Sequence, residues 1–228
     1  MPEPIFNQQS FDFLQQLANN NNRVWFNEHK TQYEETIRGP ALTLIEAMQG
    51  SIQALSPHFN AVAKKTGGSL MRVYRDTRFS KDKTPYKINI GIQFKHRCAK
   101  DVHAPAFYLH IANEECFLGA GIWRPSGPAL ANIRQMISDN PRSWENITTA
   151  VEFQRYFSLS GDRLKTYPRG YDKNHPMIND LRRKDFIAIH PLSTEQILSE
   201  SLIQTINQAY ESSADFMDYL CNALELSY

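Results

Sequence analysis

The segment from Arg75 to Lys87, RDTRFSKDKTPYK, has the clearest chemical content of this sequence. Its thirteen residues include five basic side chains, two aspartates and the aromatic residues Phe79 and Tyr86. Guanidinium groups bind carboxylate or phosphate through paired hydrogen bonds, and lysine ammonium groups act as point charges. The segment therefore predicts a site for a small anionic ligand that carries oxygen acceptors.

A second basic loop, at 165–175, has a similar content of arginine, lysine, aspartate, aromatic and proline residues. Pro168 restricts its backbone, and Gly170 permits a turn that other residues avoid. We expect the two loops to meet and to form one cleft for phosphate or carboxylate. The ligand-binding residues predicted for this cleft are Arg75, Asp76, Arg78, Ser80, Lys81, Tyr86, Lys87, Arg169, Asp172 and Lys173.

Three other interpretations of the two loops stay open. In a structural one, Asp76 and Asp82 pair with the arginines and the lysines are solvated, because ion-pair networks resemble binding sites. In an interaction module, the basic face binds an acidic protein or a nucleic acid, and nucleic acid is the weaker variant because the chain is not basic overall. In an enzyme, Asp76 or Asp172 acts as a general base beside the cations. No catalytic residue is assigned.

Histidine and cysteine side chains gather between positions 96 and 116. Their spacing matches no zinc pattern, and alternation along a strand would point them to opposite faces of a sheet. We therefore predict no metal site, and no phosphate-loop or nucleophile-elbow motif predicts a cofactor. The residues concerned are His96, Cys98, His103, His110 and Cys116.

Composition describes an ordinary globular protein of 228 residues with a net charge of +1 and 41% hydrophobic residues. The charge is unevenly distributed, because residues 64–100 are strongly basic and residues 185–228 contain no lysine or arginine. Three widely spaced cysteines form no C-x-x-C pair, which is typical of a reducing compartment. Without an apolar leader or membrane-spanning run, we expect a cytoplasmic protein with no membrane partner. The sequence predicts no oligomeric state.

Helical periodicity occupies the first sixty residues and returns near the end of the chain. Ser10 is expected to cap a first helix and Asn22 a second helix that continues to Ile37. Pro40 suits the first turn of a third helix. Near the C-terminus, Ser193 and Gln196 match a capping box before a long final helix.

Between these helical regions the apolar residues alternate with a period of two, which is typical of strands. Ranges 70–74, 88–94, 107–111, 116–123 and 186–189 are the expected strands, and their short connections predict antiparallel pairing. Residues 158–176 are interpreted as a long ordered loop. The fold class predicted is α+β, with an antiparallel sheet of about five strands packed against N-terminal and C-terminal helices. We expect residues 1–228 to form a single domain.

Three segments carry a resemblance to a known family. They are an aromatic and asparagine pattern at 11–26, the segment 75–87, and the motif Pro168-Arg169-Gly170-Tyr171-Asp172-Lys173. Together they resemble a widespread uncharacterised family, domain of unknown function 2461, over roughly residues 6 to 223. Tyr171 departs mildly from the pattern, where Phe is more usual. The resemblance implies one domain and supplies no activity, cofactor or catalytic residue.

Overall fold

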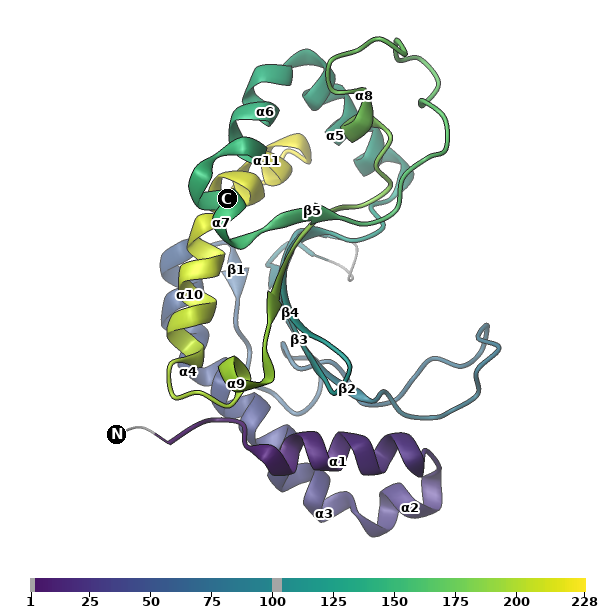
Figure 1. The fold of residues 1–228 in the computed structure, drawn as a ribbon, viewed down its shortest axis with the longest axis vertical. Coiled ribbons are helices and arrows are strands. Elements are labelled where there is room, and N and C mark those ends of the chain that lie inside the picture. Colours follow the sequence, from purple (N-terminus) through teal and green to yellow (C-terminus); the bar gives the residue numbers. More distant parts are fainter. Residues whose placement is uncertain (1–2, 100–103) are drawn as a thin grey trace.

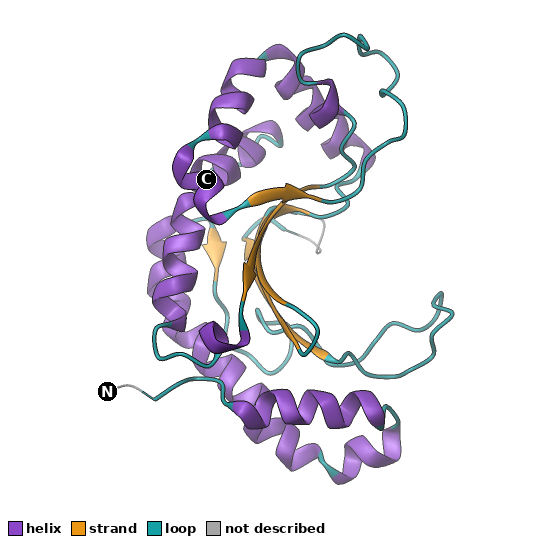
Figure 2. Cartoon of the chain, in the orientation of Figure 1, coloured by secondary structure: helices purple, strands orange, loops and turns teal. Residues whose placement is uncertain are grey.

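A curved antiparallel sheet with helices on its convex side and at both ends forms the protein (Figures 1 and 2). The computed structural model describes residues 3–99 and 104–228. Its six strands run in the order β1-β2-β3-β4-β6-β5, and each pairs antiparallel with its neighbour. The predicted α+β class is confirmed, with six strands in place of about five. None of the helices in the described ranges is long and apolar enough to cross a bilayer.

Four of the five predicted strands are present, and two very short strands were not predicted. No alternation can be recognised over two or three residues, which explains why β1 and β5 were missed. The strands are β1 (Phe59–Asn60), β2 (Asn89–His96), β3 (Ala106–Ala112), β4 (Cys116–Ile122), β5 (Ser158–Ser160) and β6 (Phe186–Leu192).

The range 70–74, predicted as a strand, is irregular and is joined to its neighbour by isolated bridges. Leu70 pairs with Ile92, and Tyr74 pairs with Tyr86. Between these bridges, the Met71 amide donates to the Gly91 carbonyl oxygen at 2.9 Å. The segment therefore follows the edge of β2 without forming a continuous ladder.

The N-terminal helices form a hairpin that leads into the long helix α4. They are α1 (Gln8–Asn19), α2 (Arg23–Glu28), α3 (Lys30–Tyr33), the π-helix η1 (Glu34–Arg38) and α4 (Gly39–Leu55). Asn22 caps α2 as predicted, because its side chain accepts a hydrogen bond from the Trp25 amide. The predicted cap at Ser10 is wrong. Asn7 caps α1, and Ser10 is buried, where its hydroxyl donates to the Thr36 carbonyl oxygen at 2.7 Å.

The helix expected over residues 22–37 is divided at His29, whose backbone leaves the helical region at φ −104° and ψ 17°. Its ring stacks on Trp25 at 4.1 Å between ring centroids. Its Nδ1 also lies 2.8 Å from the Trp25 carbonyl oxygen, which the His29 amide shares at 3.1 Å. The side chain thus competes with the helix for the same acceptor where the helix is interrupted.

The C-terminal half contributes α5 (Gly127–Asp139), α6 (Pro141–Thr149), α7 (Val151–Tyr156), α8 (Ile178–Leu181), α9 (Thr194–Ile197), α10 (Leu202–Ser212) and α11 (Ala214–Ala223). The capping box of Ser193 and Gln196 is confirmed, but it opens the single-turn helix α9 and not a long one. The long helix begins at Leu202, after a turn.

The two faces of the sheet differ in what covers them. One face packs against α4 and α10 through buried residues such as Ile92, Leu109 and Leu118 (Figure 1). The other face is concave and carries the alternate residues, among them Gln93 and Tyr108. The helices therefore leave one side of the sheet open, and the candidate site lies there.

Candidate functional site

The segment 75–87 leaves the edge of the sheet and returns to it, as Figure 1 shows at the end near α1 and α2. Its two arms are joined near the sheet, where the Arg75 amide donates to the Pro85 carbonyl oxygen at 2.9 Å and the Lys87 amide donates to the Val73 carbonyl oxygen at 2.7 Å. Lys87 therefore lies beside the outgoing chain, next to the concave face.

Asn21, in the break between α1 and α2, fastens the returning arm. Its Oδ1 accepts from the Tyr86 amide and its Nδ2 donates to the Tyr86 carbonyl oxygen, both at 3.0 Å. The Tyr86 ring is buried and stacks on Phe26 at 4.1 Å between ring centroids. A side-chain amide thus occupies the position that a neighbouring strand would take, and it fixes the residue that precedes Lys87.

Both arginines of the segment are paired with its own aspartates. Arg75 forms an ion pair with Asp82, and Arg78 contacts Asp76 through Nε at 2.9 Å and Nη2 at 2.6 Å. Hydrogen bonds from Arg78 lower the pKa of Asp76 to about 2. Hydrogen bonds from Thr84 and then Arg75 lower the pKa of Asp82 to about 2. The guanidinium charges are therefore compensated, as the structural interpretation predicts.

The tip of the segment faces solvent. Lys81 and Lys83 are exposed, Ser80 is half-buried, and Phe79 is 95% exposed. Asp82 accepts a hydrogen bond from the Thr84 amide at 2.9 Å, which turns the backbone at the tip. The tip is thus a turned, basic loop with an uncovered aromatic ring.

The loop 165–175 lies at the opposite end of the concave side from segment 75–87 (Figure 1). Arg169 and Lys173 are exposed, and Asp172 accepts from the Asn174 amide at 2.8 Å. His175 lies 3.3 Å from the Ser138 hydroxyl, which attaches the loop to α5. The structure therefore does not bring the two loops together, because each is anchored to a different end of the curved sheet.

Three cations surround a hollow beside the returning arm, which we call the cationic hollow. Its volume is about 400 Å³, and its charged lining is Arg72, Lys87, Lys95 and Asp76. Within the described ranges, no carboxylate forms an ion pair with any of the three cations, and Asp76 is paired with Arg78. Burial, and then the charge of Arg72, lower the pKa of the half-buried Lys87.

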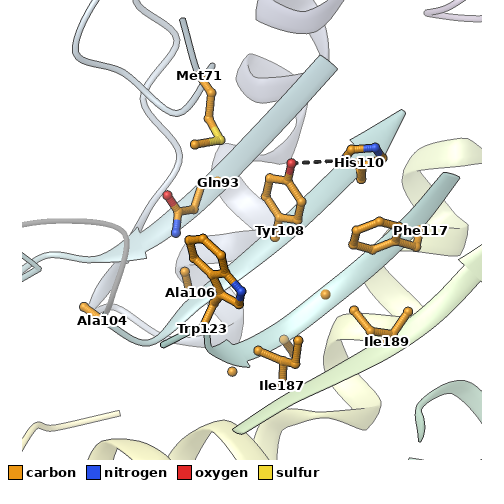
Figure 3. Close-up of a pocket in the computed structure, with 13 residues that line it drawn as sticks. Met71, Gln93, Ala104, Ala106, Tyr108, His110, Phe117, Trp123, Ile187 and Ile189 are labelled. Carbon is orange, nitrogen blue, oxygen red and sulfur yellow. Dashed lines mark hydrogen bonds between the residues drawn. The ribbon is translucent and has the colours of Figure 1, made fainter. Parts of the chain in front are cut away.

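A second hollow of about 360 Å³ opens on the concave face itself, and we call it the apolar hollow (Figure 3). The Tyr108 hydroxyl lies 3.1 Å from Nδ1 of His110, whose ring is parallel to that of Phe117 at 4.7 Å between ring centroids. Burial raises the pKa of Tyr108 to about 12 and lowers the pKa of His110. Met71 and Gln93 line both hollows, which are therefore adjacent.

Sequence reasoning missed most residues of the two hollows. Tyr108 and His110 stand out in the sequence only as the polar positions of an alternating strand, and such positions are usually solvent-facing. Arg72 and Lys95 lie outside the segment with the highest density of cations. The sequence signal that could have found these residues is the alternation within each strand. Residues 93 and 95 share a face of β2, and residues 108 and 110 share the same face on β3.

The side chains considered as metal ligands have different surroundings in the structure. His96 bonds to the carbonyl oxygen of Ser227 at 2.9 Å, Cys98 is exposed, and Cys116 is buried. His103 lies outside the described residues. In the ranges 3–99 and 104–228, no three histidine, cysteine, aspartate or glutamate side chains are placed to hold one ion.

The aspartates weighed as general bases have local structural partners. Arg78 holds the pKa of Asp76 near 2, far below the range in which a carboxylate accepts protons efficiently at neutral pH. Asp172 turns the backbone of its own loop. Each aspartate is therefore engaged by a partner within its own loop.

Fold and hollows define the protein as an α+β domain with an open, curved antiparallel sheet whose uncovered face carries adjacent cationic and apolar hollows. Residues 9–219 match the sequence pattern of a conserved hypothetical protein family, domain of unknown function 2461. The chain belongs to this family, and the match covers both basic loops. No curated protein matches the chain.

Proposed function

We propose that this protein binds a small anion, phosphate or carboxylate, in the cationic hollow. The observation that carries the proposal is the environment of Lys87, which is half-buried, lies near Arg72 and has no ion-pair partner among the described residues. Removing a charge from water without compensation costs free energy. A bound oxyanion beside Lys87 and Arg72, in the hollow that Lys95 also lines, offsets that cost.

This proposal keeps one part of the sequence prediction and changes another. Lys87 belongs to the predicted set, whereas Arg72 and Lys95 replace the contribution expected from Arg169 and Lys173. Arg75 and Arg78 already hold aspartates, so their contacts to a ligand would require these ion pairs to open. The supported site is therefore centred on the returning arm of the segment.

Calorimetric titration with inorganic phosphate at low ionic strength tests the proposal. Lys87→Met keeps the length of the half-buried side chain and removes its charge, and we expect affinity to fall by about tenfold or more. Lys81→Met removes an exposed charge from the tip and serves as the matched control, with affinity nearly unchanged. Equal losses in the two variants would mean that phosphate responds to the general positive field and not to a site.

A second candidate function is favoured by the exposure of Phe79. Its ring is 95% exposed, beside the guanidinium of Arg78 at 5.8 Å and the exposed Lys81. Single-stranded nucleic acids bind such surfaces by stacking bases on aromatic rings while cations contact the phosphates. This is the interaction-module interpretation in its nucleic-acid form.

Fluorescence anisotropy with a labelled single-stranded oligonucleotide tests this second candidate. Phe79→Ala should weaken binding, whereas Val151→Ala, at a residue that is 80% exposed on α7, should not. Binding should also weaken with added salt. Affinity that is independent of salt, or equal in both variants, would dismiss the candidate.

A further inference from the structure

The apolar hollow has the features of a ligand site, and it adjoins the cationic hollow. Ligand pockets are usually apolar cavities of about 300 to 1,000 Å³ with a few polar groups that orient the ligand. This hollow measures about 360 Å³, and its walls are mainly aromatic and aliphatic. Figure 3 shows Tyr108 at its centre, with Phe117, Ile189 and Trp123 around it.

Glycines on the concave face make the space. A β-carbon at Gly91 would lie 2.8 Å from the Tyr108 hydroxyl oxygen, so this position must stay bare for the tyrosine to hold its place. Gly119 lines the hollow itself, and a β-carbon there would lie 3.5 Å from Cβ of Tyr108, which is ordinary contact. The hollow therefore results from missing side chains on strands that elsewhere carry large ones.

The polar groups of the hollow are oriented. The Tyr108 hydroxyl oxygen and the amide nitrogen of Asn89 lie 3.1 Å and 3.4 Å from Nδ1 of His110, so Nδ1 is occupied and the other ring nitrogen is Nε2. Among the described residues, none hydrogen-bonds to that Nε2 or to the side-chain amide of Gln93. Both groups remain available to a polar atom on a ligand.

The geometry points to a ligand that fills both hollows: a small aromatic acid, with its ring over Tyr108 and its carboxylate or phosphate at Lys87 and Arg72. This inference rests on the proposed function, because the acid group occupies the proposed anion site. Met71 and Gln93 form the boundary that the ligand spans. Flat apolar groups stack well on tyrosine and phenylalanine rings, which explains the choice of an aromatic body over an aliphatic chain.

Comparison of phenyl phosphate with methyl phosphate by calorimetry tests the inference. Both carry the same acid group, and only the phenyl compound has a ring to bury. We expect phenyl phosphate to bind about tenfold more tightly to the native protein, from the apolar area removed from water. Gly119→Val places two methyl groups in the apolar hollow, and it should remove this preference while the affinity for methyl phosphate stays nearly unchanged.

Gly119→Ala, which adds only the tolerated β-carbon, covers the case in which the valine variant does not fold, and it should reduce the preference partially. Gly127→Ala, on α5 where a β-carbon meets nothing within 4 Å, is the matched control. Equal affinities for the two phosphates in the native protein, or a preference that survives Gly119→Val, would overturn the inference and leave the anion site standing. Failure of both compounds and of inorganic phosphate to bind would instead overturn the proposed function.

Discussion

At the scale of single residues, Lys87 is the side chain on which the candidate site depends. It lines the cationic hollow on one side of the returning arm and a smaller hollow with Arg75 and Asp82 on the other. Burial and the neighbouring Arg72 lower its pKa from the ordinary 10.5. Its charge is therefore lost more readily as pH rises than the charge of an ordinary lysine.

Sulfate binding should depend on pH through this lysine. Sulfate keeps its charge across the neutral and alkaline range, so a change in affinity reports on the protein. We expect the affinity for sulfate to decline as pH rises. The decline should begin below the pKa of an ordinary lysine, because the lowered pKa of Lys87 makes this side chain lose its proton at a lower pH. Lys87→Arg should bind sulfate with little decline over the same range, since arginine stays charged. A parallel decline in both proteins would assign the effect to another group.

His110 should make the stability of the fold depend on pH in the acidic range. Burial lowers its pKa in the folded protein below the ordinary 6.5, so the unfolded chain binds more protons just below that pH. Stability therefore falls as pH drops from 6.5 toward the folded pKa. Urea unfolding of the native protein and of His110→Gln at about pH 7.5 and about pH 5.5 should show a smaller loss in the variant. An identical loss would contradict the assignment.

At the scale of elements, the site depends on how the break between α1 and α2 holds the segment 75–87. Asn21 satisfies both backbone groups of Tyr86, and Phe26 of α2 stacks on the Tyr86 ring. The position of Lys87 is therefore set by a helical hairpin distant in sequence.

Asn21→Ala should weaken this attachment. Two hydrogen bonds are lost and two backbone groups are left to water, so we expect unfolding free energy to fall by about 1–3 kcal/mol. Phosphate affinity should fall as well, because the arm that carries Lys87 is released. Asn20→Ala removes a side chain that bonds only within its own helix and is the control for the measurement by urea unfolding and calorimetry. A loss of stability with unchanged affinity would show that the arm keeps its place without Asn21.

Apart from the cap at Ser10, whose hydroxyl bonds to distant Thr36, elements specified by local patterns were predictable, and those specified by distant partners were not. The cap at Asn22, the capping box at Ser193 and the alternation in β2 and β3 are each contained within a few residues. Whether range 70–74 forms a continuous strand depends instead on its hydrogen bonds with the edge of β2. The separation of the two basic loops follows from the curvature of the whole sheet, which no local pattern encodes.

At the scale of the molecule, the N-terminal and C-terminal helices share one core on the convex side of the sheet. The Tyr210 ring of α10 contacts Phe94 of β2 and Phe107 of β3. α4 and α10 also pack on each other. Segments from both halves of the chain thus bury the same face.

We therefore expect residues 1–228 to unfold as one unit. Tryptophan fluorescence and far-ultraviolet circular dichroism, followed during urea unfolding, should give coincident transitions. Trp25 lies near the N-terminal hairpin and Trp144 in the C-terminal helical layer, so the fluorescence samples both ends of the molecule. Two separated transitions would mean that the chain contains more than one domain.

The two outer strands of the sheet have a consequence for how copies of this protein meet. β1 pairs over two residues and β5 over three, and beyond β5 the uncovered part of β6 contains Pro191, which has no backbone donor. Long, flat outer strands with free donors and acceptors are templates for aggregation, and short ones interrupted by proline are not. A protein that keeps one face of its sheet open to solvent is thereby protected from polymerising along its borders.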